Sequence, residues 1–386
     1  MTKDFSVPQD YSLRKLTLYF LKLGAIGFGG PVALIGYMQN DLVTEKKWIS
    51  HDEYSEGLSL AQLAPGPLAT QLAIYLGWTR NRILGATLVG LAFILPSFLI
   101  VLVLAKLYIQ FNGLPIMQSL FFGIGPAVIA IISLSAWKLV KKTLIEDKVL
   151  WLIALVSALA TIVTESESIA TFLAAGVLYV IFKKPTSFKN PSQLRAIISP
   201  WLCTGLNGPA ASSTVTKMLL YFMKAGSMVF GSGLAIVPFL HGGVVDRFQW
   251  LSENQFLDAV AVAMITPGPV VITVAFIGYL VAGLVGATTA AAGVFLPCYL
   301  FVVIPAPFYK KIVKFERIKF FVTGVTAAAI GAIIGSVFIL GKRSIHDRTT
   351  FIISALTLGC LLKVKRIPEP VLVLLAGLVG VVIHRV

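Results

Sequence analysis

Two Pro-Gly-Pro triplets have the residue types and spacing that most clearly suggest chemistry. They are Pro65, Gly66 and Pro67 in the first half of the chain, and Pro267, Gly268 and Pro269 in the second. Each lies within a long apolar segment, where two prolines remove two amide donors and disfavour helix before each proline. We predict that both segments break there and that a new helix begins after each triplet. The first turn of such a helix offers unpaired amides and a positive dipole end, which favour an anion.

Small residues upstream of each triplet predict a second pair of breaks. Gly29 and Gly30 precede Pro31 in the first half, and Gly231 and Ser232 take the matching positions in the second. Close helix packing through small residues is the alternative explanation. A Gly-Gly-Pro run interrupts a helix, however, and irregular backbone at membrane depth is tolerated only where it lines a cavity or is buried in protein. We therefore take these glycines and Ser232, together with both triplets, as candidate substrate-binding residues.

Lys22 and Lys224 correspond to each other and could bring positive charge to the same anion. Each follows another lysine, Lys15 or Lys217, by seven positions, so the two lysines of a pair share a helix face and the second is roughly 10 Å deeper. Snorkelling, in which the ammonium group returns to the membrane interface, is the alternative. Because the spacing recurs in both halves, we favour a cationic site for a dianion and count both deeper lysines as substrate-binding candidates.

Glu56 and Asp258 also correspond, near the starts of the segments that hold the triplets. An acid in such a place most often complements the positive end of a helix dipole. The alternative is that one of them carries a coupling proton, so both are proton-coupling candidates. The sequence has no nucleophile motif, no paired histidines spaced for a metal and no phosphate-cradling loop. We therefore expect no enzyme activity, no metal site and no cofactor.

The composition places these residues in a membrane. Of the 386 residues, 57% are hydrophobic and only 13% are charged, whereas about a quarter are charged in a soluble protein. A spanning helix uses roughly 20 residues, so the apolar content suffices for about ten crossings. The formal net charge of +15 is explained by Lys and Arg in loops that stay in the cytoplasm. We expect a lipid bilayer around the protein and no nucleic-acid partner.

Twelve apolar segments can be separated by charged or turn-rich stretches, six in each half. They span residues 12–37, 53–79, 82–110, 115–140, 149–163 and 167–182, then 214–240, 253–281, 283–308, 316–341, 349–362 and 369–384. This pattern predicts an all-α polytopic membrane protein. We assign an N-terminal transmembrane repeat to 12–183, a linker to 184–212 and a C-terminal transmembrane repeat to 213–386.

The two halves are an internal duplication. Residues 15–67 align without a gap on residues 217–269, and about 16 of the 53 pairs are identical, including both triplets and the deep lysines. Shared membrane composition raises chance identity among Leu, Val and Ala, but it does not place Lys, Trp and Pro-Gly-Pro in one register. The chain therefore contains two helical repeats, each interrupted at the small-residue cluster and at the triplet.

Loop charges indicate that the repeats have inverted topology. The loop at 79–82 is basic and its counterpart at 281–286 is uncharged, whereas the next loop at 110–115 is uncharged and its counterpart at 309–319 is basic. By the positive-inside rule, equivalent loops then lie on opposite sides of the membrane. Inversion needs an odd number of crossings per repeat. Either residues 196–212 of the linker cross or re-enter, or one short segment between 149 and 182 does not cross alone.

Several sequence runs together resemble the chromate ion transporter family. They are GAIGFGGPVALIGYM and EGLSLAQLAPGPLATQLAIYLGW in the first half, and GSMVFGSGLAIVPFL and AVAMITPGPVVITVAFIGYLVAG in the second. The similarity covers the whole chain, including its two-repeat form. It implies export of chromate across the cell (inner) membrane, with sulfate as the close analogue, driven by the proton-motive force and conferring chromate resistance. The second half departs from the first because Pro31 has no partner beside Gly233, so the two glycine breaks need not have equal roles.

Other functions remain open beside chromate export. Uptake of sulfate or a related oxyanion is the main alternative, since chromate and sulfate share shape and charge, and a passive anion channel is another. Fold and family alone do not decide between such substrates. We place the N-terminus in the cytoplasm and leave the number of crossings and a homodimer open.

Overall fold

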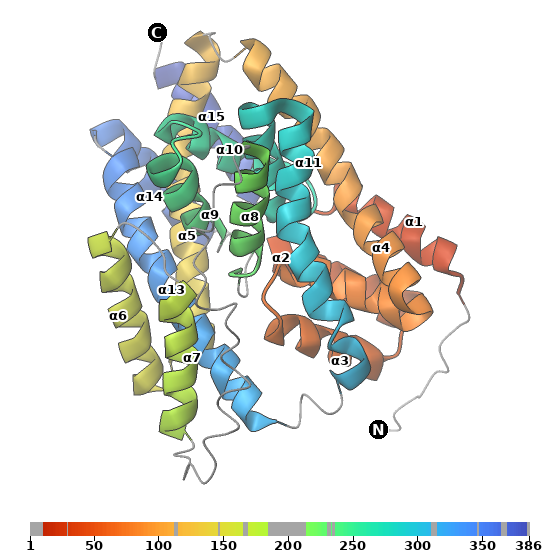
Figure 1. Ribbon diagram of the computed structural model, residues 1–386. Helices are drawn as coiled ribbons and strands as arrows, with labels where there is room; N and C mark the ends of the chain where they lie inside the picture. Colours follow the sequence, from red (N-terminus) through yellow and green to blue (C-terminus); the bar gives the residue numbers. More distant parts are fainter. Residues whose placement is uncertain are drawn as a thin grey trace.

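The computed structural model of the chain is described for residues 11–28, 30–111, 115–145, 147–164, 169–183, 214–229, 233, 236–309, 315–345, 347–363 and 369–383. Every regular element in these residues is helical, as Figure 1 shows. The prediction of an all-α protein is therefore confirmed. The linker assigned to 184–212 lies outside the described residues, as do Gly29, Gly231 and Ser232.

The first segment of each half is broken near its glycines. Helix α1 (Leu13–Ile26) is capped by Ser12, whose hydroxyl accepts a hydrogen bond from the Lys15 amide at 3.3 Å, and it ends where Gly27 becomes extended. Helix α2 (Gly30–Met38) then begins at Gly30, whose φ of 73° suits glycine. It continues into a π-helical turn, Gln39–Glu45.

The second half repeats this order of elements. Helix α8 (Thr214–Gly226) is followed by helix α9 (Ile236–His241) and by a π-helical turn, Gly242–Arg247. The π-turns occupy corresponding places after α2 and α9. Such one-turn insertions bend a helix and free backbone groups, and neither was predicted from the sequence.

The Pro-Gly-Pro triplets also interrupt their segments as predicted. Helix α3 (His51–Leu63) ends before the first triplet and helix α4 (Leu68–Phe111) begins after it. Helix α10 (Glu253–Ile265) ends before the second triplet, and a 3-10 turn, Val270–Ile272, leads into helix α11 (Thr273–Val303).

Helices α4 and α11 are helical hairpins rather than single rods. Asn81 and Arg82 leave the helical conformation, with φ of −150° and 44°, and the corresponding Ala282 and Gly283 do so with −146° and 58°. The arms fold back closely enough that a Cβ on Gly77 would meet the carbonyl oxygen of Gly85. The boundaries predicted between 79 and 82 and between 281 and 283 therefore correspond to these turns.

The remaining six helices form a second group, which we call the outer bundle. It comprises α5 (Pro115–Thr143), α6 (Lys148–Thr164), α7 (Ile169–Lys183), α13 (Glu316–Ser344), α14 (Arg348–Lys363) and α15 (Glu369–Ile383). Figure 1 shows them beside the broken helices α1–α4 and α8–α11, which we call the broken-helix bundle. Helix α10 packs against both α5 and α15 and so joins the two bundles.

The outer bundle is built by exchange between the halves. Helix α5 of the first half packs on α14 and α15 of the second, and α13 of the second packs on α6 and α7 of the first. Glycines allow the close approach, because a Cβ on Gly123 would meet the Ala376 carbonyl of α15 and one on Gly324 would meet the Ala175 carbonyl of α7. Gly123 and Gly324 are the corresponding positions of the two repeats.

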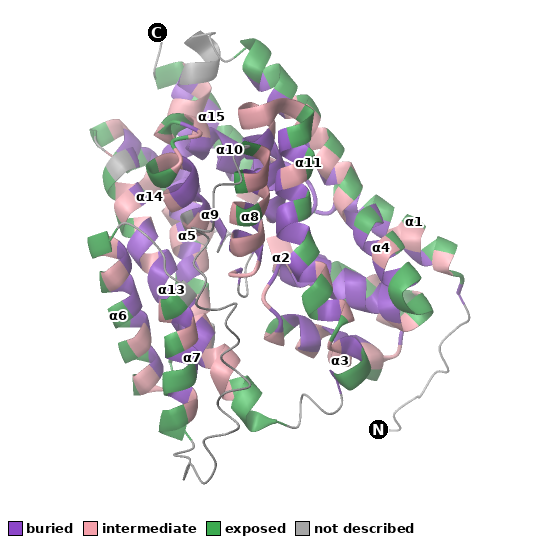
Figure 2. Ribbon diagram, in the orientation of Figure 1, coloured by how far each residue is buried: buried purple, intermediate pink, exposed green. Residues whose placement is uncertain are grey.

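Four stretches in the described residues are long and apolar enough to cross a membrane. They are Leu68–Phe111, Ser119–Lys141, Val270–Phe308 and Glu316–Lys342. The outer faces of the peripheral helices are exposed and apolar: Leu152, Leu155 and Leu159 of α6 have 53–60% of their surface exposed, and Figure 2 shows the buried residues gathered inside. Such a surface needs lipid around it, so the chain is a multi-pass membrane protein.

Candidate functional site

The four breaks meet at one place inside the broken-helix bundle. The Gly66 amide donates a hydrogen bond to the Val229 carbonyl at 2.6 Å, and the Gly268 amide donates one to the Gly27 carbonyl at 2.8 Å. Gly66 corresponds to Gly268, and Gly27 to Val229, so the two bonds are equivalent under the duplication. Each triplet is therefore bonded to the glycine break of the other half.

A second pair of contacts is also equivalent under the duplication, but each of these lies within one half. The Ser97 hydroxyl of α4 donates to the Gly24 carbonyl at 3.2 Å, and the Cys298 thiol of α11 lies 4.0 Å from the Gly226 carbonyl. Gly268 and Gly66 have positive φ of 90° and 145°. A Cβ on Gly268 would also collide with the Ser97 hydroxyl. Glycine is thus required at the triplets by both conformation and space.

The helix that starts after the first triplet presents a buried amino end. Leu68, Ala69 and Thr70 are at most 7% exposed, and the first amides of a helix have no partner within it. The Gln71 side-chain amide donates to the Pro65 carbonyl at 2.7 Å. Among the described residues, the Thr70 hydroxyl and the Gln71 side-chain oxygen are buried without a hydrogen-bond partner. Buried polar atoms without partners are uncommon and suit a polar ligand or water.

A small pocket opens beside the second triplet, between the two bundles. It is lined by Gly27, Phe28, Gly30, Met264, Thr266, Gly268, Val270, Glu369 and Pro370. Its accessible volume is about 10 Å³, close to the minimum for one water molecule. The pocket is therefore closed in this conformation and is too small for an oxyanion.

The two predicted lysines lie apart from this pocket's lining. Lys22 is exposed on α1, on the same face as Leu18 and Ile26, which are 53% and 59% exposed. Lys224 is half-buried on α8. The exposed apolar surroundings of Lys22 match those of a snorkelling lysine. Of the predicted binding residues, Gly30 and Gly268 line this pocket together, and Gly66 is bonded to Val229. Gly29, Gly231 and Ser232 lie outside the described residues.

The two predicted acids have tyrosine partners. Asp258 is 7% exposed and accepts a hydrogen bond from the Tyr108 hydroxyl at 2.7 Å, across the two halves. Glu56 lies 3.5 Å from the Tyr75 hydroxyl. Neither acid is among the residues that line the pocket, so the structure brings neither of them to the second triplet.

Sequence reasoning missed two acidic features. Glu369 lines the pocket, and its only signal was a lone acid at the start of the last apolar segment. His241 is buried between two carboxylates, with Nδ1 3.2 Å from Asp246 and Nε2 2.9 Å from Glu253. Both ring nitrogens can donate only in the imidazolium form. Glu253 lies twelve positions after His241, and the spacing of these three residues matches no known motif.

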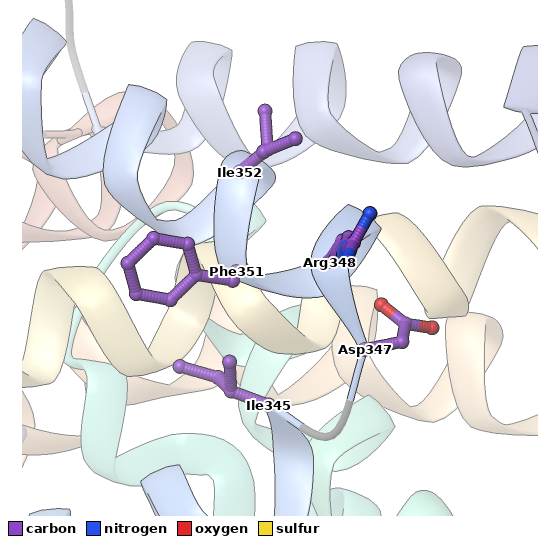
Figure 3. Close-up of a pocket in the computed structure, with 5 residues that line it drawn as sticks. All are labelled: Ile345, Asp347, Arg348, Phe351 and Ile352. Carbon is purple, nitrogen blue, oxygen red and sulfur yellow. The ribbon is translucent and has the colours of Figure 1, made fainter.

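A larger hollow lies elsewhere, at the start of α14, and Figure 3 shows its lining. Its volume is about 760 Å³, and its walls are Ile345, Asp347, Arg348, Phe351 and Ile352. Phe351 and Ile352 are 63% and 54% exposed, and the Asp347 carboxylate caps α14 by accepting from the Thr350 amide at 2.6 Å. This hollow is a surface groove of the outer bundle, and none of its described lining residues belongs to a glycine break or a Pro-Gly-Pro break.

Known proteins resemble this chain along nearly its whole length. A family model described as chromate transporter matches residues 14–180 and, again, 216–381. The chromate transport protein of Cupriavidus metallidurans is 56% identical over 97% of this chain and 94% of its own length. A probable chromate transport protein of Synechococcus elongatus is 54% identical over 96% of each chain, and the chromate transport protein of Pseudomonas aeruginosa is 34% identical over 85% and 81%. No solved structure matches.

The family match is repeated, and each copy contains one glycine break and one Pro-Gly-Pro break. The related proteins are transporters by name, which agrees with a membrane protein whose helices are interrupted at a shared buried centre. With the model covering both halves and the first two relatives nearly the whole chain, the protein belongs to the chromate transporter family.

Proposed function

We propose that this protein is a secondary active transporter that exports chromate across the cell (inner) membrane, is driven by the proton-motive force and confers chromate resistance. The observation that supports it best is the reciprocal hydrogen bonding of the four breaks, which gathers interrupted helices of both halves at one buried centre. Paired interruptions of corresponding helices mark the substrate site in many transporters. The names of the relatives supply the substrate.

The chemistry at the first triplet supports an oxyanion substrate. The buried amino end of α4 can offer amide hydrogens and a partial positive charge to oxygens of a tetrahedral dianion. The Thr70 hydroxyl lies in the same turn and has no hydrogen-bond partner among the described residues. The proposed binding residues are those predicted: the two triplets with Gly29, Gly30, Gly231 and Ser232, and Lys22 with Lys224 as the sources of full positive charge.

A carrier explains the closed pocket better than a channel does. The accessible volume of the pocket is about 10 Å³, and a chromate ion needs far more space than one water molecule. We infer that the broken-helix bundle and the outer bundle move relative to each other to open the site on alternate sides. Repeats over 12–183 and 213–386 with inverted topology, and a cytoplasmic N-terminus, give such a carrier equivalent inward and outward states.

Transport in inverted membrane vesicles tests the proposal. Chromate should accumulate in the vesicles when respiration generates a proton-motive force across their membrane, and an uncoupler should abolish this accumulation. Accumulation that persists with the uncoupler would contradict the coupling. Sulfate and molybdate added as competitors define selectivity, and sulfate transport without chromate transport would favour the uptake alternative. A conductance that does not saturate would favour a channel.

Neutralising the deep lysines tests their proposed role. Lys22→Met and Lys224→Met should each abolish chromate accumulation while the protein is still expressed and inserted. Lys15→Met and Lys217→Met are matched controls, because these exposed lysines lie seven positions earlier on the same helices. Full transport by both deep variants would remove Lys22 and Lys224 from the site.

A further inference from the structure

Among the described residues that line the pocket at the second triplet, Glu369 is the one with an ionisable side chain. It is half-buried in the first turn of α15, and the pocket also contains Gly30, the first residue of α2. An acid in the first turn of a helix stabilises that helix wherever it lies. Lining the pocket is an additional observation, since it places a carboxylate where the proposed substrate would have to pass.

The charged groups around Glu369 come from several helices. Lys138 of α5 acts on it electrostatically, but Lys138 is itself exposed. On α10, Asp258 is bonded to Tyr108, and Glu253 is bonded to His241. On α14, the ionisable residues Arg348 and Lys363 lie at its two ends. None of these charged groups is among the described residues that line the pocket. The protonation state of Glu369 therefore determines the net charge of the pocket lining.

A negative carboxylate and a dianion repel each other strongly in a pocket with little water. We propose that Glu369 is a proton-binding site of the transport cycle and that the oxyanion occupies the pocket only when Glu369 is protonated. The inference rests on the proposed function, because it concerns the same site. Asp258 and Glu56 are not among the residues that line the pocket. Glu369 is therefore the better candidate for the residue that binds the coupling proton.

The proposal fixes the sign of the coupling. If a proton on Glu369 strengthens anion binding, bound anion must strengthen proton binding by the same factor. Anion and proton therefore occupy the site together and cross the membrane in the same direction. The pair carries one net negative charge, so the membrane potential, which is the electrical component of the proton-motive force, drives its export. A neutral Glu369 keeps a hydroxyl that can donate to an anion oxygen, whereas the ionised form can only accept.

Chromate binding to the purified full-length protein in detergent tests the proposal above neutral pH, where free chromate is the dianion. For the wild type, the apparent Kd should rise with pH and approach tenfold per pH unit, because one proton must be bound. In Glu369→Gln, which has the neutral form's shape, the Kd should be independent of pH. Glu316→Gln is the matched control, an exposed first-turn acid on α13, and should keep the wild-type slope.

A second readout is proton uptake in weak buffer. Addition of chromate should raise the pH of a wild-type sample and leave that of a Glu369→Gln sample unchanged. A pH-independent Kd in the wild type, an unchanged slope in Glu369→Gln, or loss of the slope in Glu316→Gln would each overturn the proposal. If the wild type binds no chromate at any pH, the proposed function itself fails. Thermal unfolding of Glu369→Gln at the wild-type temperature confirms that the variant is folded.

Discussion

At the scale of single residues, Gly66 and Gly268 have the most demanding positions in the molecule. Each combines a positive φ with a backbone hydrogen bond to the opposite half. Gly268 also has the Ser97 hydroxyl where a side chain would begin. A side chain there would displace the Ser97 hydroxyl from its hydrogen bond to Gly24 and would lie close to the Gly24 carbonyl.

Gly268→Ala should destabilise the protein and abolish chromate transport. Forcing a side chain into such a conformation costs about 1–3 kcal/mol, and the contact with Ser97 adds to this. Thermal unfolding in detergent and vesicle transport are the measurements. Gly36→Ala is the control, since a Cβ there meets nothing within 4 Å. Equal stability of the two variants would show that the second break relaxes more readily than its geometry indicates.

The hydrogen bond between Tyr108 and Asp258 should contribute measurably to stability. Both groups are buried, with 4% and 7% exposed, and deleting one partner of a buried bond costs about 1–3 kcal/mol. Tyr108→Phe should therefore lower the free energy of unfolding by about that amount. A double-mutant cycle with Asp258→Asn isolates the pair, and additive effects would mean that the bond is not formed in the membrane.

At the scale of helices, the turn of the α4 hairpin contains a residue that contradicts local preference. Arg82 has a φ of 44°, and the corresponding residue of α11 is Gly283. Arg82 also lies over the Trp78 ring, with its guanidinium carbon 4.5 Å from the ring centre. The aromatic contact offsets part of the conformational strain.

Arg82→Gly should change the free energy of unfolding by less than about 1 kcal/mol, because relief of strain compensates the lost cation–π contact. Arg82→Val should be clearly worse, since a β-branched side chain is poorly tolerated at positive φ. Thermal unfolding of both variants, compared with the wild type, checks the order. Similar losses in the two variants would show that charge, rather than conformation, fixes this turn.

Some interruptions of the helices could be predicted from the sequence, and others could not. The breaks at both triplets were predictable because two prolines in three residues exclude a regular helix wherever the segment packs. The twelve segments follow from apolar length in the same way. The π-helical turns after α2 and α9 were not predictable, because an extra residue per turn leaves no signature in composition.

Some residues of the candidate site were also predictable from the sequence, and others were not. The glycines and prolines of the site act through the backbone, so the helix breaks that they cause can be predicted from the sequence alone. The importance of Glu369 and His241 depends on neighbours that only folding brings close. In the sequence, each looks like any other single acid or histidine near the end of a helix. The roles predicted for Lys22 and Lys224 remain predictions.

At the scale of the whole molecule, opening the closed pocket must uncover groups that are now buried. The Cys298 thiol is fully buried beside the first triplet, whereas Cys360 on α14 is partly exposed. Any motion that separates the breaks should expose Cys298.

A variant with Cys298 as its single cysteine should react with a maleimide at least about tenfold more slowly than one with Cys360 alone, because buried thiols are inert. Chromate under transport conditions should change the rate for Cys298 and leave that for Cys360 unaltered. Cys298→Ser should remain active, since Ser97 occupies the corresponding position. Equal rates for the two thiols would mean that the break is already open in the membrane.

The exchange of helices further predicts that the halves assemble without a covalent connection. Residues 1–190 and 191–386, co-expressed as two chains, should purify together and transport chromate, because α5 packs on α14 and α15 and α13 packs on α6 and α7. Either half alone leaves these faces uncovered and should be degraded. Recovery of a stable single half would show that each repeat forms its own core.

The reciprocal bonds between triplets and glycine breaks also bear on how such a chain arose. Neither half completes its own break, so an ancestral chain with one repeat would have needed a second copy, each subunit supplying the carbonyl that the other's triplet requires. Fusion then removed the need for both copies to be identical. The pairs Gly27 with Val229 and Ser97 with Cys298 record that freedom, because the side chains differ between the halves. The backbone carbonyls of Gly27 and Val229, and those of Gly24 and Gly226, still accept the equivalent bonds.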